Sequence, residues 1–146
     1  MRPRKRFGQH FLVDEQVLDA IVRAINPAAG DRMLEIGPGR GALTELLCSE
    51  VDVLHAIELD RDLIASLESR FANLRLTQGD VLDLDFAGLL HEGRWRLVGN
   101  LPYNLSSPLL LRLVGYPDQI HDMHFMLQKE WLSEWRRNPA ARPGAA

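Results

Sequence analysis

Short apolar runs alternate with longer amphipathic segments along this chain, and this order limits the fold more than any other feature. Residues 14–25 place apolar side chains three and four positions apart, which predicts a helix with Asp14 as its N-cap and Asn26-Pro27 at its end. Strands are expected at residues 32–37, 52–57, 74–77, 97–99 and 123–127, and further helices at 41–50, 61–71 and 108–114. Strands that alternate with helices form parallel βαβ units. We therefore predict an α/β fold with a doubly wound, mostly parallel sheet, and a ligand at the carboxyl ends of its strands.

The last of these helices is expected to begin at Pro108, because Ser106-Ser107-Pro108 places a proline at the first helical position, where its missing N–H costs nothing.

The composition fits one globular domain. The chain has 146 residues, of which 46% are hydrophobic, enough to build a core. Its single cysteine, Cys48, cannot form an internal disulfide and is expected to be a small buried hydrophobic residue. The N-terminus lacks the long apolar stretch of a signal peptide, and no run approaches the roughly 18 apolar residues of a membrane span. These features predict a cytoplasmic protein without a membrane partner.

Charge is unevenly distributed along the chain. The first six residues hold four cations, whereas residues 31–92 hold 13 acidic and only 5 basic residues, within a net charge of −3. A basic arm on an acidic domain suits a partner with a phosphate backbone. A solvated terminal tail would give the same pattern, so the arm alone does not decide between these interpretations.

The segment Leu34-Glu35-Ile36-Gly37-Pro38-Gly39-Arg40-Gly41 joins a predicted strand to a predicted helix. Glycines at such a junction let a ligand approach the backbone. Their spacing is G-x-G-x-G, whereas the dinucleotide fingerprint is G-x-G-x-x-G. This difference favours S-adenosylmethionine over a nicotinamide dinucleotide, because a methionine moiety rather than a pyrophosphate would lie against the turn.

Acidic residues stand at the ends of the next two predicted strands. Glu58 lies 21 residues after Gly37, close to the roughly 20 residues expected for an acid that accepts ribose hydroxyls. Asp60 directly precedes a predicted helix and is expected to be its N-cap. Asp80 can accept the exocyclic amine of an adenine. Because the carboxyl ends of parallel strands meet at one edge of a sheet, these acids and the glycine turn are predicted to line one crevice.

The segment Asn100-Leu101-Pro102-Tyr103 follows the fourth predicted strand. The N6 amine of adenine is a poor nucleophile, so a methyltransferase must hold it in line with the sulfonium methyl. The Asn100 side-chain oxygen and the Leu101 carbonyl can accept the N6 hydrogens, Pro102 stiffens the turn, and Tyr103 offers a ring on which an extruded base can stack. We predict that these four residues are catalytic. A capping Asn beside a turn proline and a core tyrosine is the structural alternative.

His121 and His124 are three positions apart, but no cysteine or acid at ligand spacing completes a metal site. We therefore expect no metal.

Four segments together resemble the N-terminal part of the ribosomal RNA adenine dimethyltransferases, which modify two adjacent adenines of small-subunit RNA. They are Lys5-Arg-Phe-Gly-Gln-His-Phe-Leu12, Glu35-Ile-Gly-Pro-Gly-Arg-Gly41, Val98-Gly-Asn-Leu-Pro-Tyr-Asn104 and Met123-His-Phe-Met-Leu-Gln-Lys-Glu130. The resemblance implies a Rossmann-like class I methyltransferase fold with S-adenosyl-L-methionine as cofactor. It also implies small-subunit ribosomal RNA, or an immature small subunit, as partner during ribosome biogenesis. We expect the protein to act as a monomer.

The resemblance also implies a set of cofactor contacts: His10, Leu12, Glu35, Gly37, Gly39, Glu58, Asp80 and Asn100. In this set Glu35 and Gly37 line the methionine end, Glu58 binds the ribose and Asp80 the adenine. Asn100 lies at the site of methyl transfer. Family members often carry Asn where this chain has His10, and a ring nitrogen or the backbone can make that contact.

Three segments are expected along the chain. Residues 1–13 form a basic, cofactor-contacting arm, residues 14–130 a partial methyltransferase domain, and residues 131–146 a tail rich in Pro, Ala and Arg. In the family, further strands and a small helical domain follow this point, so we expect a sheet that is incomplete at its C-terminal end. Two other functions stay open at this point: a catalytically impaired RNA-binding or ribosome-assembly factor, and a nicotinamide-dependent oxidoreductase.

Overall fold

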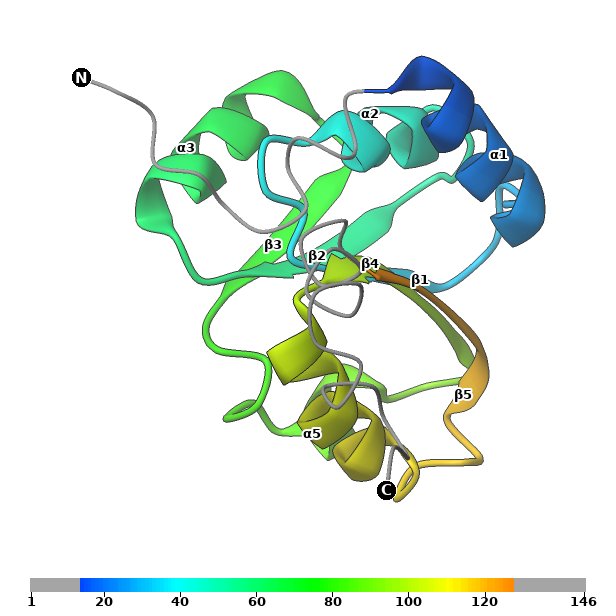
Figure 1. Ribbon diagram of the computed structural model, residues 1–146, viewed down its shortest axis with the longest axis vertical. Coiled ribbons are helices and arrows are strands. Elements are labelled where there is room, and N and C mark those ends of the chain that lie inside the picture. Colours follow the sequence, from blue (N-terminus) through cyan, green and yellow to red (C-terminus); the bar gives the residue numbers. More distant parts are fainter. Residues whose placement is uncertain (1–13, 128–146) are drawn as a thin grey trace, which may run out of the picture.

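The computed structural model describes residues 14–127, which form a five-stranded sheet with helices on both faces (Figure 1). The helices are α1 (Glu15–Ile25), α2 (Ala42–Cys48), α3 (Arg61–Arg70), α4 (Phe86–Leu89) and α5 (Tyr103–Leu113). The strands are β1 (Met33–Ile36), β2 (Leu54–Glu58), β3 (Leu74–Gln78), β4 (Trp95–Leu101) and β5 (Ile120–Leu127). They are all parallel, in the order β3-β2-β1-β4-β5. This arrangement confirms the predicted doubly wound α/β fold.

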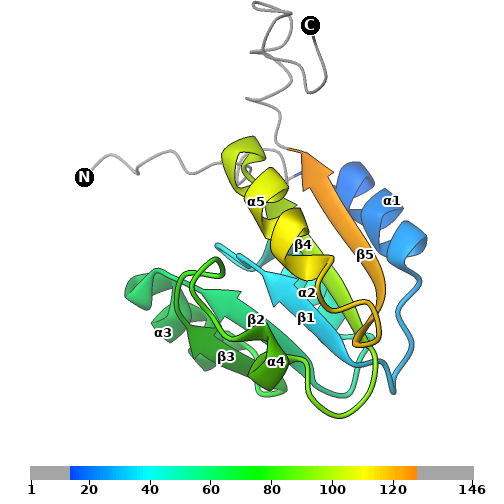
Figure 2. The same ribbon diagram turned by 90° about the horizontal axis from the view of Figure 1, so that it is seen from below.

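Two apolar layers enclose the sheet. Helices α1, α2 and α3 cover one face, and α4 and α5 cover the other (Figure 2). Successive strand residues point to opposite faces, so β1 contributes Met33 to the first layer and Leu34 and Ile36 to the second. Burial on both faces explains why the strands read as continuous apolar runs. None of the helices within residues 14–127 is long and apolar enough to cross a membrane.

Short polar side chains fix the starts of two helices. Asp14 accepts hydrogen bonds from the N–H groups of Gln16 and Val17, at 2.9 and 3.3 Å, and caps α1. Asp60 caps α3 in the same way. Both caps confirm the sequence predictions. A short acceptor at this position bonds N–H groups that the helix itself leaves unpaired.

The predicted start of the last helix is wrong. Helix α5 begins at Tyr103, five residues earlier than expected, and Pro108 lies inside it. Pro102 precedes the helix with φ −60° and ψ 145°, and its carbonyl accepts the N–H groups of Leu105 and Ser106 at 3.0 and 3.1 Å. An internal proline costs about 3 kcal/mol, which the burial of Leu109 and Leu113 helps to offset. Tyr103 is therefore the first residue of a helix and not part of a turn.

Cys48 is half-buried at the end of α2, less buried than expected. It packs against the first apolar layer. Burial, together with the charge of Glu35, raises the pKa of its thiol to about 11. The thiol therefore stays protonated, in keeping with a packing role.

Arg96 joins three segments at the amino ends of the strands. Its guanidinium donates to Asp31 at 2.8 Å and to Asp122 of β5 at 3.0 Å. It also donates to the carbonyl oxygens of Ile25 and Asn26 at the end of α1. One side chain on β4 thus fixes α1, the loop before β1, and β5.

We expect Arg96→Met to lower the free energy of unfolding by about 2 to 4 kcal/mol, because it leaves two carboxylates and two carbonyls without their donor. Urea denaturation measures this loss. Arg23→Met is the matched control, since Arg23 is an exposed arginine in the last turn of α1 and its loss should cost no more than about 0.5 kcal/mol. Equal urea midpoints for the two variants would show that the Arg96 cluster does not stabilise the fold.

Candidate functional site

The carboxyl ends of four neighbouring strands bring the predicted site residues to one edge of the sheet. Strands β3, β2, β1 and β4 are adjacent, and backbone hydrogen bonds connect the turns that follow them. The N–H of Gly37 donates to Ile57 at 2.9 Å, and the N–H of Gly79 donates to Glu58 at 3.0 Å. The glycine turn, both acids and the segment after β4 therefore share one edge, as predicted.

The glycine turn after β1 depends on backbone conformations that favour glycine. Gly37, Gly39 and Gly41 have φ values of 71°, 60° and 90°. A Cβ at Gly37 would meet no heavy atom within 4 Å, so the backbone there faces open space. A Cβ at Gly41 would lie 2.9 Å from Leu67, which packs α3 against the start of α2. Gly37 thus leaves room for a ligand, whereas Gly41, which was not predicted as a site residue, serves packing.

Glu58 fastens this turn to β2. Its Oε1 accepts the N–H of Gly39 at 3.1 Å, and its Oε2 accepts the N–H groups of Leu59 and Asp60 at 2.9 and 3.0 Å. The side chain is buried. A carboxylate offers about four acceptor positions, so most of this capacity is already used by the backbone. Glu58 is held firmly at the predicted ribose position, with Oε1 as the less occupied oxygen.

Glu35 of β1 is buried and bonded to Thr44 of α2. It is only 2% exposed, and its Oε1 accepts the hydroxyl of Thr44 at 2.6 Å. Burial raises the pKa of Glu35 to about 7; the Thr44 hydrogen bond opposes this shift and the charge of Glu58 adds to it. Thr44 was not predicted from the sequence, although a threonine on the buried face of the following helix is a suitable donor. Contact between Glu35 and the methionine end stays a prediction.

Asp80 lies in the turn after β3 and is exposed. Its Oδ1 accepts the N–H of Leu82 at 3.0 Å. This local bond orders the turn and leaves the carboxylate at the edge of the sheet, where an adenine amine would approach it.

The segment Asn100–Tyr103 spans the end of β4 and the start of α5. The side-chain oxygen of Asn100 is buried and has no hydrogen-bond donor within the part of the chain that the structure describes. A buried acceptor without a donor costs about 1 to 3 kcal/mol. The Leu101 side chain is buried, Pro102 precedes the helix, and Tyr103 is 41% exposed. An unsatisfied oxygen beside an exposed ring is an arrangement that fits an incoming amine on an aromatic base.

Two predicted contacts, His10 and Leu12, lie outside the described residues. The predicted boundaries of the basic arm (residues 1–13) and of the tail (residues 131–146) also lie outside the described residues or directly beside them. His121 is exposed, and His124 lies 3.2 Å from Asp122. Residues 14–127 contain no group of three or more His, Cys, Asp or Glu side chains arranged to hold a metal ion.

The fold and site define a Rossmann-like class I S-adenosylmethionine-dependent methyltransferase domain. A solved RNA methyltransferase from Salinibacter ruber, in complex with S-adenosyl-L-homocysteine, shares the fold with a TM-score of 0.58 and 16% identity, over 70% of this chain and 68% of that one. A dimethyladenosine transferase from Plasmodium falciparum is similar with a TM-score of 0.67 and 28% identity, over 86% of this chain and 46% of that one.

The sequence identifies the family. Residues 1–142 match the family described as ribosomal RNA adenine dimethylase, and the chain belongs to it. The ribosomal RNA small subunit methyltransferase A of Cupriavidus taiwanensis is 50% identical over 141 residues, which are 95% of this chain and 51% of the relative. The chain therefore spans about half the length of the curated relatives it matches. The predicted family and fold class are confirmed.

We expect the stability of the protein to depend on the protonation of Glu35. Unfolding lowers its pKa from about 7 to the ordinary 4.5, so the folded state binds more protons between these values and loses stability as the pH rises through them. Glu35→Gln cannot ionise and keeps the shape of the neutral acid. The free energy of unfolding of the variant, minus that of the parent, should therefore rise by about 2 to 3 kcal/mol from pH 5 to pH 8.

Urea denaturation at several pH values measures this difference. Glu45→Gln, at an exposed position of the same helix as Thr44, serves as the control and should run parallel to the parent. A difference for Glu35→Gln that stays constant with pH would mean that Glu35 is not held neutral by the fold.

Proposed function

We propose that this chain binds S-adenosylmethionine at the carboxyl edge of its sheet and forms the methyl-transfer site of a ribosomal RNA adenine N6,N6-dimethyltransferase. The observation that carries the proposal is the buried Asn100 oxygen without a donor among the described residues, on the edge shared by the glycine turn and Glu58. Membership of the family supports the same function. Neither the family nor the similar folds offer support for a nicotinamide-dependent oxidoreductase.

The chain's own residues fit the cofactor. The open backbone at Gly37 would receive its methionine part, with Gly39 beside it in the same turn, and Glu58 would accept a ribose hydroxyl through Oε1. Asp80 would accept the adenine amine, and His10 and Leu12 would add contacts from the N-terminal arm. Bound S-adenosylmethionine supplies a methyl group on a positively charged sulfur.

The Asn100 segment would orient the nucleophile. The Asn100 oxygen and the Leu101 carbonyl accept hydrogens from the N6 amine, so that its lone pair is directed along the line of transfer. Tyr103 supplies a ring against which the extruded base stacks. Glu35 would be a tempting general base because its pKa lies near 7, but it is buried beneath α2 and bonded to Thr44. We assign it to the scaffold, since a methylated amine releases its proton readily without a specialised base.

We further propose small-subunit ribosomal RNA, within an immature small subunit, as the substrate of the whole protein, acting as a cytoplasmic monomer. The relatives' name and the basic arm support ribosomal RNA as the substrate. Because the chain spans half of its relatives' length, we expect these 146 residues to bind the cofactor with little or no turnover.

We expect Glu58→Ala to weaken the binding of S-adenosylhomocysteine by about 2 to 3 kcal/mol, because a charged acceptor is lost and its partners are left unpaired. Isothermal titration of the 146-residue chain measures this change. Glu58→Gln keeps the volume and one acceptor oxygen, and should fall between the parent and Glu58→Ala.

Asp62→Ala, an exposed acid in the first turn of α3, is the control and should bind like the parent. Unchanged affinity in Glu58→Ala would exclude the ribose role. Heat of binding with NAD and none with S-adenosylhomocysteine would exclude the proposed cofactor.

We expect Asn100→Ala to lower the rate of methyl transfer about 100-fold or more, roughly 3 kcal/mol of transition-state stabilisation. The measurement is single-turnover transfer to small subunits that lack the modification, by this chain extended with the second half of a relative. Cofactor affinity should change much less, because the oxygen acts on the base. Tyr103→Phe keeps the stacking ring and serves as the control, with a rate near that of the parent. A rate equal to that of the parent in Asn100→Ala would show that the segment Asn100–Tyr103 has only a structural role.

A further inference from the structure

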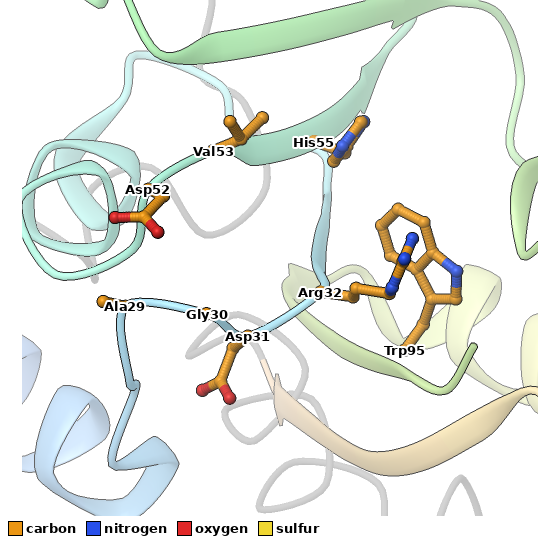
Figure 3. A pocket seen from close by; sticks show the side chains of 8 residues that line it. All are labelled: Ala29, Gly30, Asp31, Arg32, Asp52, Val53, His55 and Trp95. Atoms are coloured by element: carbon orange, nitrogen blue, oxygen red, sulfur yellow. The ribbon is translucent and has the colours of Figure 1, made fainter. Parts of the chain in front are cut away.

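A second surface lies at the opposite edge of the sheet. A hollow of about 210 Å³ opens there between the amino ends of β1, β2 and β4 (Figure 3). Its lining residues are Ala29, Gly30, Asp31, Arg32, Asp52, Val53, His55 and Trp95. The parallel strands separate it from the methyl-transfer edge by their full length, so it does not belong to the site described above.

Two arginines keep uncompensated charge at this hollow. Arg32 lies in its wall and is exposed, and Arg75 of β3 is in register with His55. Within residues 14–127 the ion pairs involve Arg96 and His124, so neither Arg32 nor Arg75 has a carboxylate partner there. Arg32 and Arg75 are two of only five basic residues in the acidic stretch 31–92.

The backbone binds the guanidinium of Arg75 and lies close to that of Arg32. Arg32 extends toward Trp95 in Figure 3 and lies over Gly93, where a Cβ would approach its Nε to 3.0 Å. Gly93 has a φ of 111°, so a side chain there would be strained as well. Arg75 donates to the carbonyl oxygens of Ala72 and Leu74, at 3.0 and 3.3 Å. The cations are thus partly ordered before any ligand binds.

The pKa of His55 is lowered by burial and in part by the positive charges around it. Its ring meets Trp95 edge-on, with centroids 5.0 Å apart. Burial lowers its pKa, and the positive charges of Arg75, Arg32 and His91 lower it further. A neutral imidazole can still donate one N–H to an anion.

Two acids also line the hollow, and one of them is already paired with another arginine. Asp31 is engaged by Arg96 at 2.8 Å and by the N–H of Ala28 at 2.7 Å. Asp52 lies across the hollow from Arg32 and Trp95 (Figure 3). Arg32 and His55 line the hollow, and Arg75 is in register with His55 on the neighbouring strand. The surface formed by these three residues, called here the basal surface, carries two arginines without a carboxylate partner among residues 14–127.

We propose that the basal surface binds the phosphate backbone of the RNA substrate, as a second contact on the edge of the sheet opposite the methyl-transfer site. The inference rests on the proposed function, because it takes RNA as the substrate. The donors come from β3, from β2 and from the residue directly before β1, and these neighbouring strands lie about 4.8 Å apart, so the donors form a row. A row of this kind matches an extended polyanion better than a single phosphate, which convergent donors would enclose. Arginine suits the role because its planar group bonds phosphate oxygens in pairs.

The test is the salt dependence of RNA binding by the 146-residue chain, measured by fluorescence anisotropy with a labelled RNA hairpin that carries a single-stranded flank. Each lost phosphate contact should reduce the slope of log K against log salt by about 0.7. Arg32→Gln should therefore lower the slope by about 0.7, and Arg32→Gln/Arg75→Gln by about 1.4. Arg23→Gln, an exposed arginine on α1, is the matched control and should leave the slope unchanged.

Parallel slopes for the parent and the double variant would overturn the inference, and so would a parent chain that binds no RNA at low salt. Binding of inorganic phosphate is measured on the same variants. If phosphate binds saturably to the parent and not to the double variant, while the RNA slopes stay parallel, the hollow is a site for small anions. That result would overturn the RNA contact. Titration with S-adenosylhomocysteine on the same samples separates the two proposals. Parallel slopes with cofactor binding retained overturn the basal surface alone, whereas loss of cofactor binding by the parent overturns the proposed function.

Discussion

The Glu58 carboxylate holds the functional edge of this protein together. Three backbone N–H groups donate to it, one from the turn after β1 and two from the turn after β2. The glycine turn has little side-chain packing of its own at Gly37, so this bond gives it a fixed place. A second buried acid lies near, and two carboxylates close together are costly to ionise at once. Burial and the charge of Glu58 raise the pKa of Glu35 to about 7, so a large share of this side chain is neutral at pH 7.

The parallel sheet separates two kinds of recognition. Its carboxyl edge carries acids, open backbone and neutral acceptors, which suit a cofactor with a positively charged sulfur and an amine on a base. The acids at this edge, among them Glu58 and Asp80, repel a polyanion. Contacts with an RNA backbone must then come from elsewhere on the molecule. The basal surface is one place where this chain holds arginines away from Glu58.

Local pattern was enough to predict the fold and the edge of the sheet at which the candidate site residues lie. The features that were predicted depend on residues close to one another in the sequence. They are the alternation of strands and helices, the N-caps Asp14 and Asp60, and the acid that ends β2. The failures concern partners distant in sequence. The bond from Thr44 to Glu35 exists only because α2 packs on β1, and Pro108 lies inside α5 because Pro102 already starts the helix and Leu109 and Leu113 bury its inner face. A proline rule that reads neighbours alone could not anticipate that balance.

In the proposed reaction, the change of charge on sulfur during methyl transfer favours an amide at position 100. An aspartate would accept the N6 hydrogens more strongly, but its charge would also stabilise the sulfonium before transfer, when the positive charge is greatest. Transfer removes that charge from sulfur, so the stabilisation would favour the ground state over the transition state. A neutral oxygen avoids this penalty and still directs the lone pair of the amine. Its burial without a donor in the described chain keeps it dry, and an acceptor without competing water binds an arriving N–H more strongly.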